Sequence, residues 1–116
     1  MKILVLDDDT VLLTVMEAVL SKNGHEVTCI DNPEEAVALV AENDYDFLLV
    51  DYQMGGKTGV WFMENVNLPA QTKVLLITGS VDRDIITNMF DLGASGYIIK
   101  PFDEAELLRH LEFHTK

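Results

Sequence analysis

Phe47-Leu48-Leu49-Val50-Asp51 is an apolar run that stops on a carboxylate. It is too short for a helix, and we interpret it as a buried strand that delivers Asp51 to a site. Three further apolar runs also stop on polar groups: Ile3 to Leu6 before Asp7-Asp8-Asp9, Val74 to Ile77 before Thr78, and Tyr97 to Ile99 before Lys100. In open α/β sheets ligands bind beyond the carboxyl ends of the strands. These endings are therefore expected to converge on one pocket.

Helical patterns alternate with these strands along the chain. A fifth strand is expected at Val27 to Ile30, and helix-start patterns occur at Asn32-Pro33-Glu34-Glu35 and at Asp103 with Glu106. The residues expected to face the core from the helices are Leu12, Val15, Met16, Val19 and Leu20; Ala36, Val37 and Val40; Trp61, Phe62 and Val66; Ile85, Ile86, Met89 and Phe90; and Leu107, Leu108 and Leu111. Strict alternation predicts an α/β fold, a doubly wound sheet of five parallel strands with helices on both faces.

Composition limits the class of protein. The 116 residues, 48% of them hydrophobic, suffice for one domain spanning residues 1–116. A net charge of −12, from 20 acidic and 8 basic residues, argues against nucleic-acid and anionic-membrane partners. The single cysteine, Cys29, lies within an apolar run and is expected to be a buried structural thiol, in keeping with a reducing compartment. No signal peptide or membrane span is recognisable, so we expect a soluble, cytoplasmic protein.

The polar strand ends suggest a chemistry. Asp7, Asp8 and Asp51 brought together would repel one another unless a cation compensates them, and Mg²⁺ prefers such oxygen ligands. A hydroxyl at Thr78 and an ammonium at Lys100 complete a set with a nucleophilic carboxylate, a metal, a donor and a fixed cation. That set suits phosphoryl transfer, in which catalysis is mainly positioning and charge neutralisation.

On these motifs the whole chain resembles a response regulator receiver domain. The resemblance implies that Asp51 accepts the phosphoryl group, that Asp8 binds Mg²⁺ directly and Asp7 nearby or through water, and that the Gln53 carbonyl is a further ligand. It implies that Thr78 and Lys100 bind phosphoryl oxygens, and that the strand order is flavodoxin-like, 2-1-3-4-5. The implied partners are a sensor histidine kinase or phosphotransfer protein and, for output, a downstream protein target or a missing effector domain.

The resemblance also implies regulation. Thr78 and Tyr97 would form a conformational switch, with Tyr97 moving as Thr78 is drawn toward the phosphoryl group. Gln53 and Ser80 would tune slow hydrolysis of the acyl phosphate, so that the chain catalyses its own phosphorylation and dephosphorylation while serving mainly as a signalling switch. Two departures stand out: Gly55-Gly56 follows Met54 where the family commonly has proline, which is expected to loosen the loop, and Ser95-Gly96 replaces the acids of receivers that dimerise through this region.

Other interpretations remain open at this stage. Asp7-Asp8-Asp9-Thr10-Val11 also resembles the first motif of haloacid dehalogenase-like phosphatases, with Asp7 as nucleophile, although Asp51 would then have no role. Asp9 is expected to cap the following helix. His110 and His114 have the i, i+4 spacing of a metal clamp, but without a third ligand we expect them to be surface residues.

Overall fold

In the computed structural model, which describes residues 1–52, 59–79 and 82–115, strands and helices alternate along the chain. The strands are β1 (Lys2–Leu6), β2 (Glu26–Ile30), β3 (Phe47–Asp51), β4 (Lys73–Thr78) and β5 (Gly96–Ile99). The helices are α1 (Thr10–Lys22), α2 (Pro33–Glu42), α3 (Gly59–Asn65), α4 (Arg83–Asp91) and α5 (Glu104–His114).

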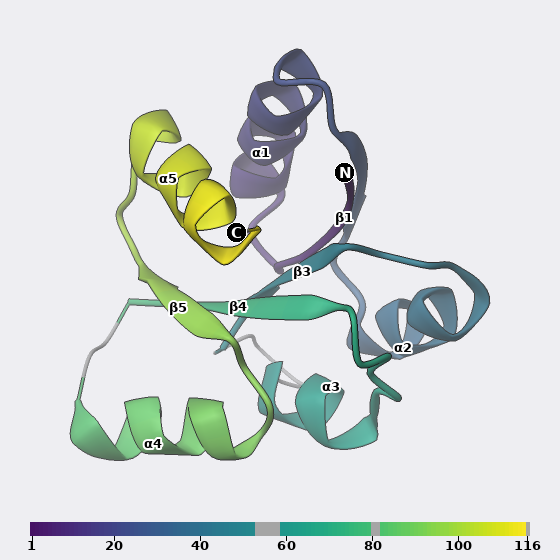
Figure 1. The fold of residues 1–116 in the computed structure, drawn as a ribbon, viewed down its shortest axis with the longest axis vertical. Coiled ribbons are helices and arrows are strands. Elements are labelled where there is room, and N and C mark those ends of the chain that lie inside the picture. The colour runs from purple at the N-terminus through teal and green to yellow at the C-terminus, as the bar shows by residue number, and fades with distance from the viewer. Residues whose placement is uncertain (53–58, 80–81, 116) are drawn as a thin grey trace.

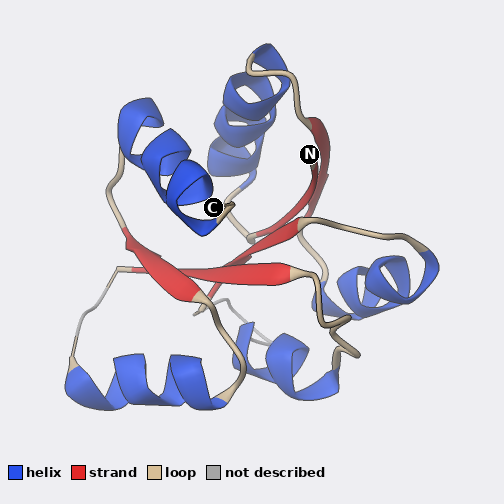
Figure 2. Ribbon diagram, in the orientation of Figure 1, coloured by secondary structure: helices blue, strands red, loops and turns tan. Residues whose placement is uncertain are grey.

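The strands form one parallel sheet in the order β2-β1-β3-β4-β5, which confirms the expected fold class and strand order. Figure 1 shows α1 and α5 on one side of the sheet and α2, α3 and α4 on the other. The sheet is thus the middle layer of three, as Figure 2 also shows. β1 and β3, which carry the aspartates at their ends, lie side by side at the centre.

Two apolar clusters fill the space between these layers. On one face of the sheet Leu13, Met16 and Leu20 of α1 pack with Leu107 and Leu111 of α5. On the other face the fully buried Phe62 of α3 and Met89 of α4 pack beneath the central strands together with α2. β3 is buried along its whole length, so continuous apolar runs correctly indicated strands covered on both sides.

The helix ends follow the capping patterns of the sequence. The Asp9 side chain accepts hydrogen bonds from the Val11 and Leu12 N–H groups at the start of α1. The Asn32 side chain, just before Pro33, accepts them from the Glu34 and Glu35 N–H groups at the start of α2. After α1 the chain turns through Gly24, whose φ of 88° is costly for any residue with a Cβ. Phe62 lies in the core as expected, and Trp61 packs against it.

The expected inward faces of α1 and α4 were partly wrong. Val15 is 53% exposed and Phe90 48% exposed, whereas Leu13, which was not expected in the core, is buried. The first half of α1 carries apolar residues on several sides, so periodicity alone did not fix which stripe faces the sheet. None of the described helices has the length and apolar character needed to cross a bilayer.

Candidate phosphoryl-transfer site

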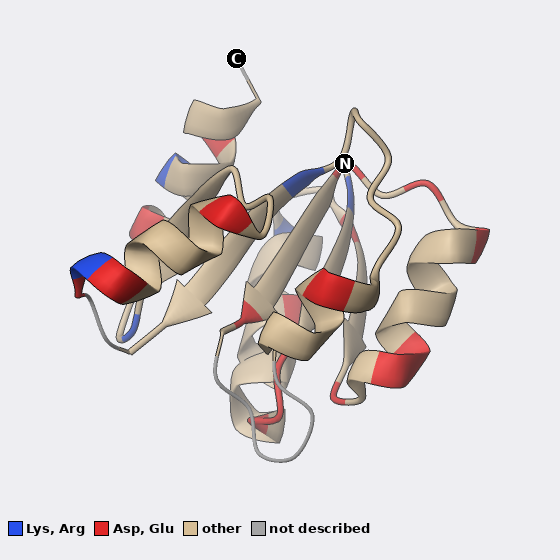
Figure 3. Cartoon of the chain, turned by 90° about the horizontal axis from the view of Figure 1, so that it is seen from below, with Lys and Arg blue, Asp and Glu red and all other residues tan. Residues whose placement is uncertain are grey.

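Three carboxylates meet at the carboxyl ends of the two central strands. β1 and β3 pair with Leu6 beside Val50, so that Asp7 and Asp51, the next residues, extend from the sheet side by side. One carboxylate oxygen from each of Asp7, Asp8 and Asp51 lies within 4.8 Å of the other two. Asp7 and Asp51 are buried, whereas Asp8 is exposed toward solvent. Figure 3 shows acidic positions at strand ends and along several helices, with far fewer basic ones.

Lys100 offsets part of the negative charge of this cluster. Its Nζ lies 3.1 Å from Oδ2 of Asp7 and 3.4 Å from Oδ2 of Asp51, bridging the two buried carboxylates. Burial lowers the pKa of Lys100, but the hydrogen bond to Asp7 and the negative charges of Asp51 and Asp7 outweigh it, so its pKa is raised. The ammonium therefore stays protonated within the site.

The residue that caps α1, Asp9, holds Asp7 in place. The Asp9 N–H donates to Oδ1 of Asp7 at 2.9 Å, while the Asp9 side chain caps the helix that follows. Asp9 therefore has a structural role, as the sequence indicated. Asp7 has one oxygen on the Asp9 N–H and the other on Lys100, which fixes the orientation of this buried carboxylate.

Thr78 lies at the end of the neighbouring strand. It is 2% exposed, and the preceding residue, Ile77, pairs with Asp51 in the β3–β4 register. The structure therefore brings Asp7, Asp8, Asp51, Thr78 and Lys100 to the same edge of the sheet. Gln53, Ser80 and the Gly55-Gly56 pair lie outside the described residues, so the expectations for these positions remain predictions.

The donor set fits a hard divalent cation. Carboxylate oxygens are ligands that Mg²⁺ prefers, and the exposed Asp8 gives the cluster a side open to water, of which Mg²⁺ keeps several. Asp7, Asp8 and Asp51 form the only group of three candidate ligands among the residues that the structure describes. Among the same described residues, His110 and His114 belong to no such group. Both are partly buried beside β5, so the expectation that they are surface residues was only partly right.

Two residues near Asp51 were not singled out from the sequence. Gly59, the first residue of α3, lies so close to the Asp51 carbonyl that a Cβ there would be 2.0 Å from the oxygen. Tyr52 follows Asp51, is 7% exposed, and accepts a hydrogen bond from Asn88 of α4. No local pattern in the sequence indicates that Gly59 lies against Asp51 or that Tyr52 meets Asn88.

Comparison with known proteins agrees with this architecture. The family model for the response regulator receiver domain matches residues 3–112. The chain is 31% identical over 116 residues to the chemotaxis protein CheY-3 of Vibrio cholerae, covering 97% of this chain and 89% of that protein. It is 33% identical over 113 residues to the transcriptional regulatory protein AruR of Pseudomonas aeruginosa, covering 92% of this chain but 46% of AruR. This chain thus spans less than half the length of AruR.

A solved structure shows the same fold. The chemotaxis protein CheY4 of Vibrio cholerae superposes with a TM-score of 0.90 at 27% identity, covering 97% of this chain and 96% of that one. A flavodoxin-like sheet with acidic residues at the ends of its central strands is the architecture of a signalling receiver. The chain belongs to the response regulator receiver domain family of two-component signalling. The dehalogenase-like alternative, with Asp7 as nucleophile, is not favoured.

Proposed function

We propose that this chain takes a phosphoryl group from a partner histidine kinase or phosphotransfer protein onto Asp51, in a Mg²⁺-dependent reaction. The observation that carries the proposal is the cluster of Asp7, Asp8 and Asp51 bridged by Lys100. A cytoplasmic setting and a single receiver domain over residues 1–116 are part of the same proposal.

Each residue of the site has a separate role in the proposed phosphoryl transfer. An Asp51 carboxylate oxygen forms a bond to phosphorus as the bond from phosphorus to the donor's imidazole nitrogen breaks, and that imidazole leaves with the electron pair. Lys100 and Thr78 stabilise the phosphoryl oxygens, Lys100 by charge and Thr78 by hydrogen bonding. Asp7, Asp8, Asp51 and the Gln53 carbonyl would hold Mg²⁺, which would neutralise the negative charge on the phosphoryl oxygens.

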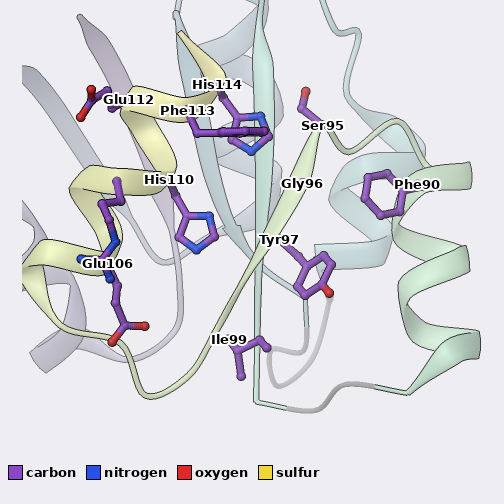
Figure 4. Close-up of a pocket in the computed structure, with 11 residues that line it drawn as sticks. Phe90, Ser95, Gly96, Tyr97, Ile99, Glu106, His110, Glu112, Phe113 and His114 are labelled. Atoms are coloured by element: carbon purple, nitrogen blue, oxygen red, sulfur yellow. The ribbon is translucent and has the colours of Figure 1, made fainter. Parts of the chain in front are cut away.

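The output is a change in a protein-binding face built from α4, β5 and α5. Tyr97 on β5 is partly buried, and its ring meets that of Phe90 edge-on, with centroids 6.4 Å apart. Figure 4 shows Tyr97 turned toward Phe90, with His110 and His114 reaching toward β5 from the other side. These side chains line a hollow of about 820 Å³. Movement of Tyr97 with Thr78 would reshape it for a downstream target, or for an effector domain of a longer protein.

The direct test is incubation with acetyl phosphate and Mg²⁺, followed by mass spectrometry. We expect one acid-labile phosphoryl group, absent from Asp51→Asn and lost from the wild type in excess chelator. If Asp51→Asn is labelled as fully as wild type while Asp7→Asn is not, Asp7 is the nucleophile and the proposal fails. Slow loss of the label should change in Gln53→Ala and Ser80→Ala; unchanged lifetimes would remove both residues from the hydrolysis step.

The switch is tested by amide chemical shifts. Phosphorylation is expected to shift amides of α4, β5 and α5 as well as those beside Asp51, and Tyr97→Ala is expected to reduce the distant shifts. Shifts confined to the surroundings of Asp51 would count against a Thr78–Tyr97 switch.

A further inference from the structure

A buried tyrosine joins the segment that carries Asp51 to helix α4. The Asn88 Nδ2 donates a hydrogen bond of 2.8 Å to the hydroxyl oxygen of Tyr52, across 36 residues of sequence. The Tyr52 ring is 7% exposed in the core beneath the sheet, and its N–H donates to the Ile77 carbonyl at 2.7 Å. Tyr52 therefore follows β3 in the chain and is bonded to β4 through its N–H, and its hydroxyl is bonded to α4.

α4 itself is lightly packed. Met89 is its one buried residue, Ile85 and Ile86 are partly buried, and Phe90 is 48% exposed. Elements with few buried apolar contacts open locally at low free-energy cost. In such a helix a single directed hydrogen bond has a large share in fixing position. Asn88 is itself exposed, so packing does not hold its side chain, and the bond to Tyr52 gives that side chain a defined direction.

We propose that Tyr52 is a positioning residue, and that its hydrogen bond to Asn88 couples the state of Asp51 to the position of α4. The inference rests on the proposed phosphorylation of Asp51 and adds a route to its regulation. Asp51 and Tyr52 are adjacent, so a displacement of the backbone at the modified aspartate would move the Tyr52 hydroxyl and, through the bond, the part of α4 around Asn88. Before modification, the same bond holds α4 in a fixed position relative to the sheet.

Two substitutions remove the bond from opposite sides. Tyr52→Phe keeps the buried ring and deletes the acceptor, and Asn88→Ala deletes the donor at an exposed helical position where alanine is well tolerated. Thr87→Ala, at the adjacent exposed position of α4, is the matched helix control. Tyr45→Phe, a tyrosine that is 4% exposed and precedes β3, controls for loss of a buried phenol hydroxyl.

The experiment measures amide exchange and amide shifts of the full chain before and after treatment with acetyl phosphate and Mg²⁺. In Tyr52→Phe and Asn88→Ala, exchange in α4 is expected to rise about fivefold before treatment, while β1 and β3 keep their protection. Phosphorylation-induced shifts in α4 are expected to fall by roughly half, with labelling of Asp51 retained. The double variant should show no more than either single variant, because both remove the same interaction.

The outcomes separate the two proposals. Wild-type shifts in α4 for both variants, with Asp51 labelled, would overturn the role of Tyr52 and leave the proposed function intact. Equal acceleration of amide exchange in α4, β1 and β3 would show a general loss of stability and would also overturn the role of Tyr52. Absence of label from wild-type Asp51 would overturn the proposed function and this inference together.

Discussion

Lys100 is the residue on which the charge balance of the site depends. Its Nζ lies 3.1 Å from Oδ2 of Asp7, which is fully buried, and 3.4 Å from Oδ2 of Asp51. The Lys100 side chain itself is 29% exposed. Removing one partner of a largely buried pair leaves the other charge poorly compensated. We expect Lys100→Gln to lower the free energy of unfolding by about 1–3 kcal/mol, measured by urea titration in excess chelator.

The control for this substitution is an exposed pair on the same molecule. The Lys22 Nζ lies 2.7 Å from Oε1 of Glu104, and the two side chains are 66% and 41% exposed. Exposed pairs contribute little, so Lys22→Gln should lower the free energy of unfolding far less than Lys100→Gln does. A loss in Lys100→Gln no larger than that in Lys22→Gln would contradict the structural role of Lys100. Added Mg²⁺ should recover part of the Lys100→Gln loss, because a divalent cation compensates the same carboxylates.

Cys29 is partly buried rather than fully buried, and we expect its thiol to react slowly at neutral pH. Burial, and to a lesser degree the charge of Glu17, raises the pKa of Cys29 to about 11, and its sulfur donates to the Leu13 carbonyl at 3.5 Å. The unfolded thiol titrates near pH 8.5, so any stability from this group is present below about pH 8.5 and is lost as pH rises toward 11. At pH 8 a thiol reagent should label the folded chain far more slowly than the urea-unfolded chain; equal rates would contradict the burial.

At the scale of elements, strand ends were predictable and helix faces were less so. The run ending at Asp51 was read correctly because a buried parallel strand is apolar on both faces and its polar end breaks the pattern. α1 offered no such break. Apolar residues such as Val11 and Val15 share the helix with Leu13, and only the packing of the helix on the sheet decides that Leu13 is buried.

Contacts between elements were beyond the reach of local patterns. The proximity of the three aspartates could be predicted from the sequence, because the carboxyl ends of parallel strands lie at the same edge of a sheet. The sequence contained no indication that the amide of Asn88 meets the hydroxyl of Tyr52, since both residue types are common on unrelated surfaces. Nor could it place the start of α3 against the Asp51 carbonyl, which requires the three-dimensional path of the chain.

Gly59 fixes how closely α3 approaches the site. A Cβ at this position would lie 2.0 Å from the Asp51 carbonyl oxygen and 2.9 Å from its carbon, so the backbone would have to shift. We expect Gly59→Ala to lower the free energy of unfolding by about 1–3 kcal/mol, as overpacking does, and to slow phosphorylation of Asp51. Denaturant titration and the rate of labelling by acetyl phosphate measure the two effects.

Gly79 provides the comparison for Gly59. It follows Thr78, and a Cβ built on it has no neighbour within 4 Å among the residues that the structure describes, its chain neighbours aside. Gly79→Ala should therefore change stability by less than about 1 kcal/mol, and a small gain is consistent with a less flexible unfolded chain. Equal losses in the two variants would show that close packing at Gly59 is not the cause.

At the scale of the whole molecule, the charge distribution works against the folded state. The chain carries a net charge of −12, and self-repulsion of this kind destabilises a compact protein. Part of that repulsion is concentrated where Asp7, Asp8 and Asp51 converge. The arrangement that disfavours the metal-free protein is also the one that attracts a divalent cation. Stability and metal binding should therefore change in opposite directions when Asp8 is neutralised.

Asp8→Asn tests this opposition. In excess chelator we expect the variant to be as stable as wild type or more stable by up to about 1 kcal/mol, because one of three crowded charges is removed. Mg²⁺ at about 100 times its dissociation constant should stabilise wild type by about 2.7 kcal/mol, and this gain should be largely lost in the variant. Thermal unfolding is followed with and without Mg²⁺, against NaCl of equal ionic strength to remove general screening. Glu17→Gln removes an exposed charge from the middle of α1 and should keep the full Mg²⁺ response. If Asp8→Asn keeps that response as well, the stabilisation by Mg²⁺ does not depend on the carboxylate cluster at the ends of β1 and β3.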